Sequence, residues 1–383
     1  MQIETIKTTF ANAVSRVSRA ISASRANDNA AFGCVLVEGA EGKVKLTGTN
    51  GDILISTEIA CEVSRPTSMA VPAGLLNKLL SALPEGVLQI AYDSNALKVE
   101  VKSSVGRTKI ACVEPDKFPK AAEDDEMTSL AIQNAALREI LRKTSYAAST
   151  DDTRKTIRNT LFALRADGLT AVATNGRLLA KVDYSRDMKG SPEGDIEILV
   201  PPTACSLLAD KAILGGDGVV RIEVPATNRV YAKFTCGDTV LRTRLFDGVF
   251  PSYEKVIPAD SGTPATIDRQ RLVDAIERAS IFSPSGESGY VSLTFAPDGS
   301  LRVESQKSDA GNSDETMQID YKGSKVRMLV AKRYIMPILK AIDDDEVAIH
   351  ISSGHSPLMV KCSIPFLAVV MPMRDESTAG GVA

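Results

Sequence analysis

The sequence repeats itself with a period of about 130 residues, and this period constrains the fold more than any other feature. Three segments open on Val71, Val200 and Val330 and run into a short apolar helix, at spacings of 129 and 130 residues. Pro72 and Pro201 suit the first helical turn, where a missing N–H costs nothing. Self-similarity at a fixed spacing indicates a duplicated structural unit. The pattern predicts three copies within the 383 residues.

A second helix family precedes each of these segments, and alternating apolar and polar residues between the helices predict strands. The second helix family covers residues 7–22, 134–149 and 268–283. The clearest strands are residues 87–92, 97–102, 219–224 and 347–351. Each copy is therefore an α+β domain. Boundaries fall in polar stretches, giving domains 1–125, 126–260 and 261–375, with 376–383 as a disordered tail.

Several function classes are disfavoured by composition. No apolar run reaches the roughly 18 residues that span a bilayer, and the N-terminus lacks a signal-peptide layout, so we expect a cytoplasmic protein. The six cysteines are scattered along the chain, which favours reduced thiols over disulfides or zinc ligands. Only His350 and His355 are available as histidine ligands or bases. We expect no catalytic residues, no metal site and no cofactor.

Charge is distributed unevenly along the chain. The six helix windows hold fourteen Lys and Arg residues against six Asp and Glu. The windows thus carry +8, and because the whole chain carries −3, the remainder carries −11. A single Lys or Arg in a helix usually indicates only that this face of the helix is exposed to solvent. Segregation across six helices, however, predicts one surface suited to phosphate contacts without base readout.

The partner on that surface should be duplex DNA, because the chain has few aromatic residues and no Trp for stacking on single strands. Binding should be loose and strongly salt-dependent. The helix residues that we expect to face DNA are Arg16, Arg19, Lys78, Arg138, Arg142, Lys143, Arg269, Arg271, Lys332, Arg333 and Lys340.

Three motifs carry a resemblance to a known family. Residues 172–180 read VATNGRLLA, residues 245–258 read LFDGVFPSYEKVIP, and residues 369–374 read VVMPMR. Together with the threefold repeat and the LTGT of residues 46–49, they closely resemble the bacterial sliding clamp, the beta subunit of the replicative DNA polymerase. The resemblance covers the full length.

The motifs also make physical sense as parts of a recess. The run from Thr174 to Arg177 is a turn in which Gly176 permits an unusual backbone angle. Pro372 presents a rigid apolar rim, and Met371 and Met373 supply adaptable surface for several partners. Taken alone, a Met-Pro-Met run more often lies in the buried core. The resemblance instead favours a place on the binding surface.

The resemblance implies a groove between the second and third domains that binds short peptides carrying a Gln and a Leu-Phe-type tail. The matching positions are Arg154, Ile157, Thr174, Gly176, Arg177, Leu179, Pro251, Val256, Tyr334, Val369, Met371, Pro372, Met373 and Arg374. The family usually has Asp-Gly-His-Arg-Leu where this chain has Asn175-Gly-Arg-Leu-Leu. One acidic and one basic position are therefore lost, and the peptide preference can differ. Pro337 predicts a kink or an early stop in the last helix.

The resemblance also implies a head-to-tail homodimer that forms a ring around duplex DNA, with helices lining the inside and sheets forming the outside. The matching interface positions are Thr108 and Ile110 on an edge strand, and Ile281 and Phe282 in the third domain. Arg25 and Asp152 match loops at the mouth of the channel. The implied protein is a non-catalytic processivity factor that tethers the replicative polymerase, the clamp loader, other polymerases and repair proteins.

Two other interpretations stay open. The chain could be a monomeric three-domain scaffold for peptides. Alternatively, the acidic runs at residues 123–126 and 343–346 could hold Mg²⁺ in an enzyme, although such runs are usually solvated linkers.

Overall fold

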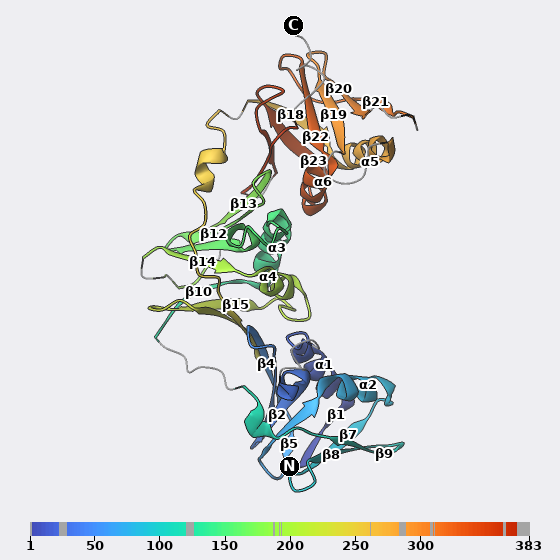
Figure 1. The fold of residues 1–383 in the computed structure, drawn as a ribbon, viewed down its shortest axis with the longest axis vertical. Coiled ribbons are helices and arrows are strands. Elements are labelled where there is room, and N and C mark those ends of the chain that lie inside the picture. The colour runs from blue at the N-terminus through green and yellow to red at the C-terminus, as the bar shows by residue number, and fades with distance from the viewer. Residues whose placement is uncertain are drawn as a thin grey trace. The chain divides into compact units, whose positions relative to one another are not determined.

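The computed structural model describes residues 2–22, 29–119, 126–186, 188–190, 192, 194–260, 262–282, 289–306, 309, 311–362 and 365–373. One order of elements occurs three times along the chain: a strand, a helix, four strands, a second helix and three strands (Figure 1). In the first repeat a short additional strand, β5 (Glu62–Val63), interrupts this order. The prediction of a repeated α+β domain is confirmed.

The first repeat consists of β1 (Gln2–Ile6), α1 (Lys7–Ser18), β2 (Cys34–Ala40), β3 (Lys43–Thr49), β4 (Ile53–Ala60), β6 (Ser68–Pro72), α2 (Ala73–Ala82), β7 (Val87–Asp93), β8 (Lys98–Ser103) and β9 (Gly106–Ala111). The second consists of β10 (Met127–Gln133), α3 (Asn134–Thr144), β11 (Thr160–Arg165), β12 (Gly168–Thr174), β13 (Leu178–Tyr184), β14 (Ile196–Val200), α4 (Pro202–Ala209), β15 (Val219–Pro225), β16 (Tyr231–Cys236) and β17 (Thr239–Arg244). The third consists of β18 (Thr263–Asp268), α5 (Arg269–Ala279), β19 (Tyr290–Phe295), β20 (Ser300–Ser305), β21 (Asp314–Gln318), β22 (Val326–Ala331), α6 (Lys332–Ala341), β23 (Glu346–Ile351), β24 (Leu358–Lys361) and β25 (Phe366–Val370).

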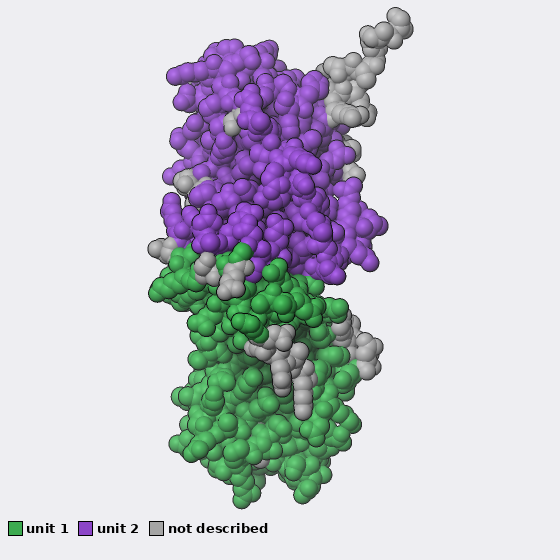
Figure 2. Space-filling model, turned by 90° about the vertical axis from the view of Figure 1, so that its left-hand side faces the viewer, with its two compact units in different colours: residues 1–138, 187–194, 206–245 green, residues 139–186, 195–205, 246–383 purple. Residues whose placement is uncertain are grey.

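The chain divides into two compact units (Figure 2). Unit 1 comprises residues 1–138, 187–194 and 206–245, and unit 2 comprises residues 139–186, 195–205 and 246–383. The division therefore runs through the second repeat rather than between repeats.

Each unit contains one sheet of eight strands that joins strands of two successive repeats. In unit 1 the strand order is β10-β15-β16-β17-β4-β3-β2-β6, and in unit 2 it is β14-β11-β12-β13-β25-β24-β23-β18. The junctions are antiparallel: β17 pairs with β4 through five residue pairs, from Thr239 with Thr57 to Thr243 with Ile53. Likewise β13 pairs with β25, from Leu178 with Val370 to Val182 with Phe366. Neighbouring repeats are thus joined by backbone hydrogen bonds.

The two smaller sheets, one in each unit, end in edge strands that lack a neighbour on one side among the described residues. The five-stranded sheet of unit 1 runs β5-β1-β7-β8-β9, and the four-stranded sheet of unit 2 runs β21-β20-β19-β22. Strands β9 and β21 each have one neighbour only among the described residues. Such edges present unpaired backbone N–H and C=O groups.

The helices form because apolar residues recur at helical spacing on one face. In α1 the buried residues are Phe10, Ala13, Val14 and Val17, and this face packs on β3 and β4 and against α2. Helix α5 buries Leu272 and Ile276 in the same way and packs against α6.

The helices of the family that opens each repeat end earlier than predicted, at Ser18, Thr144 and Ala279. Hydroxyl side chains near these ends donate to carbonyls one turn back: Ser18 Oγ to Val14 O at 2.6 Å and Thr144 Oγ1 to Ile140 O at 2.8 Å. Such bonds compete with helix propagation. The predicted strands, in contrast, are confirmed as β7, β8, β15 and β23.

The predicted early stop at Pro337 is wrong. Helix α6 continues from Lys332 through Pro337 to Ala341. The proline lies in the second turn, where its missing N–H removes only the bond to the carbonyl of Arg333.

Candidate functional site

The pocket that contains the C-terminal motif lies within unit 2 and has a volume of about 650 Å³. Its walls come from the segment after α3, the β12–β13 turn, the start of α6 and the segment after β25. The lining residues are Tyr146, Ala148, Ser149, Thr150, Asp151, Arg154, Asn175, Arg177, Leu178, Arg333, Tyr334, Met371, Pro372 and Met373.

The β12–β13 turn is held by its own side chains. Asn175 Oδ1 accepts from the backbone N–H groups of Arg177 and Leu178, both at 2.9 Å. Thr174 Oγ1 accepts from Gly176 N at 3.1 Å and donates to Leu178 O at 2.7 Å. Gly176 has φ +84°, as predicted for this turn. The turn therefore presents Arg177 outward on a fixed backbone.

The rim formed by the residues after β25 is anchored at two points. Met371 N donates to Arg177 O at 2.9 Å, and Met373 N donates to Leu329 O at 2.8 Å. Met371 remains 40% exposed. The Met-Pro-Met run is therefore surface rather than core.

An apolar cluster of unit 2 contains two of the predicted groove residues, Leu179 and Val369, together with Leu161, Val172, Leu199, Phe250, Tyr253 and Met359. Ile157 packs against it and is partly buried. The phenol of Tyr253 has its pKa raised to about 12, first by burial and then by Glu254. Leu179 and Val369 are only 3% and 2% exposed, because they take the inward positions of β13 and β25. In the ligand-free structure these two side chains therefore pack in the apolar cluster, and their place in a groove stays a prediction.

The structure gathers part of the predicted groove set at the pocket. Arg154, Arg177, Tyr334, Met371, Pro372 and Met373 line it. Ile157, Thr174, Gly176, Pro251 and Val256 are not lining residues, although Val256 is 50% exposed. Arg374 lies outside the described residues.

The sequence missed the segment from Tyr146 to Asp151, and it assigned Arg333 to the DNA-facing set, whereas Arg333 lines the pocket. The Arg333 guanidinium donates to the Tyr334 hydroxyl at 2.8 Å and stacks over that ring with 4.7 Å to its centroid.

Most basic residues predicted to face DNA have partners within the chain. Arg16 is half-buried and donates to Ala212 O at 2.9 Å and to Thr239 Oγ1 at 3.1 Å. Arg19 pairs with Asp210, Arg142 with Asp343, and Lys340 with Glu277 at 2.9 Å. Arg138 donates to Leu214 O, and Arg269 to Asp344 O at 2.8 Å. The three ion pairs reduce the positive charge that is available to a phosphate, whereas the bonds to neutral oxygens occupy N–H donors without changing the charge.

Other members of that set are less engaged. Lys78 and Arg271 are exposed and form no ion pair with another described residue. Lys332 is half-buried; the pKa of Glu277 is lowered first by its hydrogen bond with Lys340 and then by the charges of Lys340 and Lys332. Arg25 lies outside the described residues. Asp152, expected at the channel mouth, is exposed and pairs with Arg158.

Lys143 corrects the prediction, since its side chain is only 2% exposed. Its ammonium pairs with Glu139 at 3.1 Å and lies 5.9 Å from the centroid of the Phe366 ring. Because burial excludes solvent, it also excludes a phosphate group, so Lys143 cannot face DNA in this conformation.

The residues predicted for a subunit interface lie at accessible places with one exception. Thr108 and Ile110 are on the edge strand β9, as expected, but the Ile110 side chain is 6% exposed and only its backbone is at the edge. Ile281 is 74% exposed at the end of α5, followed by the half-buried Phe282.

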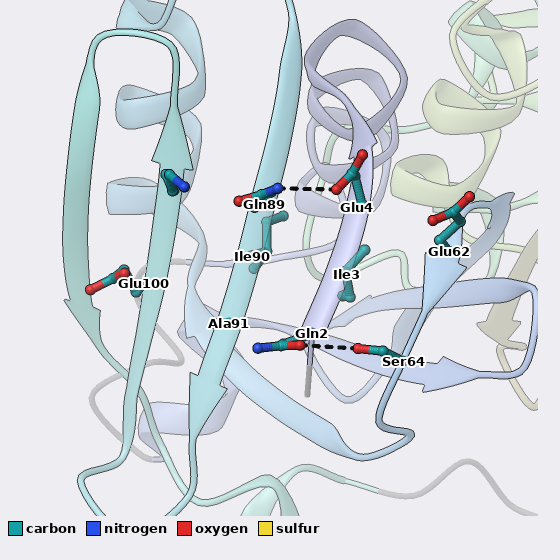
Figure 3. A pocket seen from close by; sticks show the side chains of 10 residues that line it. Gln2, Ile3, Glu4, Glu62, Ser64, Gln89, Ile90, Ala91 and Glu100 are labelled. Atoms are coloured by element: carbon teal, nitrogen blue, oxygen red, sulfur yellow. Dashed lines mark hydrogen bonds between the residues drawn. The ribbon is translucent and has the colours of Figure 1, made fainter.

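A second concavity, of about 380 Å³, lies on the outer five-stranded sheet (Figure 3). Glu4, Glu62 and Glu100 line it with a single cation, Lys102. Gln89 Nε2 donates to Glu4 at 3.1 Å and Ser64 Oγ to Gln2 at 3.2 Å, as the dashed lines mark. These side chains alternate with the buried Ile3 and Ile90, so they project from the face opposite the core. An acidic face repels phosphate, which matches the expected segregation of charge.

The acidic run at residues 343–346 connects α6 to β23, and its last residue, Glu346, begins that strand. Asp343 pairs with Arg142, and the carbonyls of Asp344 and Asp345 accept from Arg269. Within the described ranges, no group of three His, Cys, Asp or Glu residues is arranged to hold a metal ion. The run at 123–126 lies outside the described residues except for Glu126. No helix in the described part of the chain is long and apolar enough to cross a membrane.

Three family models match the chain in succession. They are the N-terminal domain of the DNA polymerase III beta subunit over residues 1–122, the central domain over 131–252 and the C-terminal domain over 254–374. The beta sliding clamp of Synechocystis sp. is 26% identical over 385 residues, covering 95% of this chain and 97% of that protein. The beta sliding clamp of Pseudomonas aeruginosa is 26% identical over 343 residues, covering 89% of this chain and 90% of that one.

Solved structures share the fold. The DNA polymerase sliding clamp of Bacillus subtilis superposes with a TM-score of 0.91 at 20% identity, covering 98% of this chain and 99% of that one. The sliding clamp of Pseudomonas aeruginosa bound to griselimycin superposes with a TM-score of 0.90 at 23% identity, covering 98% and 100%. On the family models and the full-length relatives, the chain belongs to the DNA polymerase III beta subunit family, the bacterial beta sliding clamps.

Proposed function

We propose that the chain closes as a head-to-tail homodimer around duplex DNA and acts as a non-catalytic processivity factor. Three clamp domains, residues 1–125, 126–260 and 261–375, would place six repeats around one hole, with helices inside and sheets outside. The observation that carries the proposal is the threefold repeat with a free edge strand in its first and last copies. The proposal needs no cofactor, and it places the ring in the cytoplasm with the DNA.

The ring would close through the edge strands β9 and β21. Strand β9 carries Arg107 and Lys109, whereas β21 carries Asp314 and Glu315. Lys109 pairs with Glu100, Asp314 with Arg302 and Glu315 with Arg278 within the chain, so the edge backbones rather than these charges would carry the joint. Pairing β9 of one subunit with β21 of the other would satisfy exposed backbone groups at both joints. A mutual arrangement of this kind closes rather than polymerises. Ile281 and Phe282 would add apolar contact beside the strands.

DNA would be retained by encirclement and contacted only loosely. The least engaged basic residues, Lys78 and Arg271, together with those released from their internal partners, would contact phosphates and read no bases. Such contacts allow sliding and weaken steeply with salt.

The pocket in unit 2 would tether partners through short linear peptides with a polar anchor and an apolar tail. The partners would be the replicative polymerase, the clamp loader, other polymerases and repair proteins. Burial of two or three apolar side chains at about 1.5–3 kcal/mol each, less ordering costs, suits micromolar, exchangeable binding. Similar clamps from Pseudomonas aeruginosa and Bartonella birtlesii are solved with griselimycin bound, which supports a ligand site on this fold.

The test is loading of labelled protein onto nicked circular DNA by a clamp loader, followed by linearisation. Retention on the circle and release from the linear ends would support encirclement. Equal retention on both forms would contradict it. Sedimentation decides the monomeric alternative: a monomer at micromolar concentration would exclude the ring while leaving peptide binding intact. Mg²⁺-dependent nuclease or polymerase activity in the pure protein would overturn the non-catalytic role.

A further inference from the structure

We propose that the pocket selects peptides whose polar anchor is a carboxylate, from Glu or Asp, in preference to the neutral amide of Gln. This inference rests on the proposed peptide-tethering function and names the chemistry of its partners.

The lining is strongly cationic. Arg154, Arg177 and Arg333 contribute guanidinium groups, and Asp151 is the only carboxylate among the described residues that line the pocket. These described residues together carry an excess of two positive charges. The guanidinium carries only donors, whereas the hydroxyl groups of the lining, on Tyr146, Ser149, Thr150 and Tyr334, can donate or accept.

Arg177 contributes the least neutralised of these charges. It is exposed, and no carboxylate among the described residues pairs with its guanidinium. Its neighbour Asn175 holds the turn through Oδ1, which accepts from two backbone N–H groups. A carboxylate at position 175 could make the same bonds but would place a negative charge beside Arg177. The neutral Asn175 keeps the turn and leaves the charge of Arg177 available.

Arg154 and Asp151 form a loose pair. Arg154 Nε lies 3.7 Å from Asp151 Oδ2, and its Nη1 donates to Asn175 O at 3.2 Å. Asp151 Oδ1 is engaged by Thr153, from the backbone N–H at 2.9 Å and from the hydroxyl at 2.7 Å. These bonds lower the pKa of Asp151, followed by the charges of Arg154 and Arg158. Among the described lining residues, the ionised Asp151 is thus engaged by Thr153 and lies beside Arg154, and it leaves Arg177 without a carboxylate partner.

The opposite wall adds a further donor. Arg333 already donates to the Tyr334 hydroxyl, which fixes this pair against the pocket. A Gln amide is neutral and can bond only through its oxygen to a guanidinium, whereas both oxygens of a carboxylate can accept from guanidinium groups and carry the opposite charge. Charge-assisted hydrogen bonds are about twice as strong as neutral ones. The lining therefore favours Glu or Asp over Gln.

The test uses three fluorescent peptides with one apolar tail and Glu, Gln or Lys at the anchor, titrated with the full chain and read by anisotropy. At low salt we expect the Glu peptide to bind about 5- to 10-fold more tightly than the Gln peptide, and the Lys peptide to bind most weakly. Raising the salt should shrink this difference, because exposed charges are screened within about 10 Å at 0.1 M.

Two variants locate the effect. Arg177→Gln should weaken binding of the Glu peptide several-fold more than binding of the Gln peptide, and so remove most of the advantage of the Glu peptide. Asp151→Asn should strengthen binding of the Glu peptide. Lys322→Gln, at an exposed residue that does not line the pocket, is the matched control and should change neither.

The outcomes separate the two proposals. If the Gln peptide binds as tightly as the Glu peptide at low salt, or if Arg177→Gln weakens both equally, the carboxylate preference is overturned while peptide tethering stands. If no peptide binds to a chain that unfolds cooperatively, peptide tethering itself fails.

Discussion

At the scale of single residues, the burial of the Lys143 side chain is the property that the sequence predicted least well. It lies among basic residues at the end of α3, yet it is buried with Glu139 and Phe366. The sequence shows that Lys143 carries a positive charge, but whether solvent reaches the ammonium depends on the fold. The same holds for Leu179 and Val369, whose burial in an apolar cluster of unit 2 is set by the fold.

Lys143→Met should be nearly neutral for stability, because Glu139 is 36% exposed and can be solvated after the exchange. Replacing a buried pair by an apolar residue of similar volume is often neutral, whereas Lys143→Glu would bury a second negative charge and cost about 3–5 kcal/mol. Denaturant unfolding measures both. A loss of DNA retention in Lys143→Met, without a loss of stability, would show that the ammonium reaches DNA after all.

His350 should make the stability of the chain depend on pH near neutrality. Burial, followed by the charge of Lys361, lowers its pKa, and its Nδ1 has no hydrogen-bond partner among the described residues. The unfolded chain therefore binds a proton first, as pH falls through about 6.5, and the folded chain loses stability until its own lower pKa is reached.

Replacing His350 by Gln should flatten the difference in unfolding free energy between pH 7.5 and pH 5.5, measured by urea titration. His355→Gln is the matched control, since His355 is exposed and is the only other histidine. An unchanged slope in His350→Gln would assign the pH dependence to carboxylates instead.

At the scale of elements, the sequence predicts strands and helices well and their ends less well. Alternation over five or six residues identifies β7, β8, β15 and β23, because one face of each is buried. The window for α3 overran its true end at Thr144 by five residues. For this reason the sequence missed Tyr146 to Asp151, which leave the helix and line the pocket. The hydroxyls of Thr144 and Ser145 were the available signal.

The edge strand β9 offers a sharp test of subunit closure. Cys112 N donates to Leu97 O at 2.8 Å, so antiparallel alternation turns the N–H groups of residues 110 and 108 toward β8 and that of Lys109 away. Lys109→Pro should therefore leave the sheet folded and remove an outward donor from both joints. We expect a dimer weakened about tenfold in sedimentation.

Two controls accompany this variant. Lys109→Ala removes the side chain but keeps the N–H, and it should remain a dimer. Thr108→Pro breaks the ladder to β8 and should lower the thermal midpoint. A dimer unaffected by Lys109→Pro would mean that the subunits do not join through the β9 backbone.

At the scale of the whole molecule, the helices show less free positive charge than the sequence count of +8 suggests. Arg19 and Arg142 are each paired with an aspartate that follows the second helix of the next repeat, Asp210 and Asp343. These pairs stabilise contacts between repeats and withhold the two arginines from phosphate. Sequence counting could not detect this, because the partners are 191 and 201 residues apart.

Asp210→Asn and Asp343→Asn should each release one arginine for DNA. We expect tighter binding of short duplexes at low salt and a salt dependence steeper by roughly one unit of log–log slope for each variant. Fluorescence titrations between 50 and 200 mM salt would measure it. Asp167→Asn, at an exposed turn between β11 and β12, controls for the change in net charge. If all three variants behave alike, the released arginines do not meet phosphates.

The sequence could not predict that neighbouring repeats share a sheet. Alternation of apolar and polar residues predicts a strand, but it does not say which other strand pairs with it. The consequence of the shared sheets concerns how such a chain can be divided. A fragment cut at a repeat boundary would strip β4 of β17, or β25 of β13, and would leave a row of unpaired amides on a strand with a buried face. Fragments of this kind should aggregate rather than fold as small soluble proteins. The smallest pieces expected to fold are therefore the two units, each of which contains a complete eight-stranded sheet.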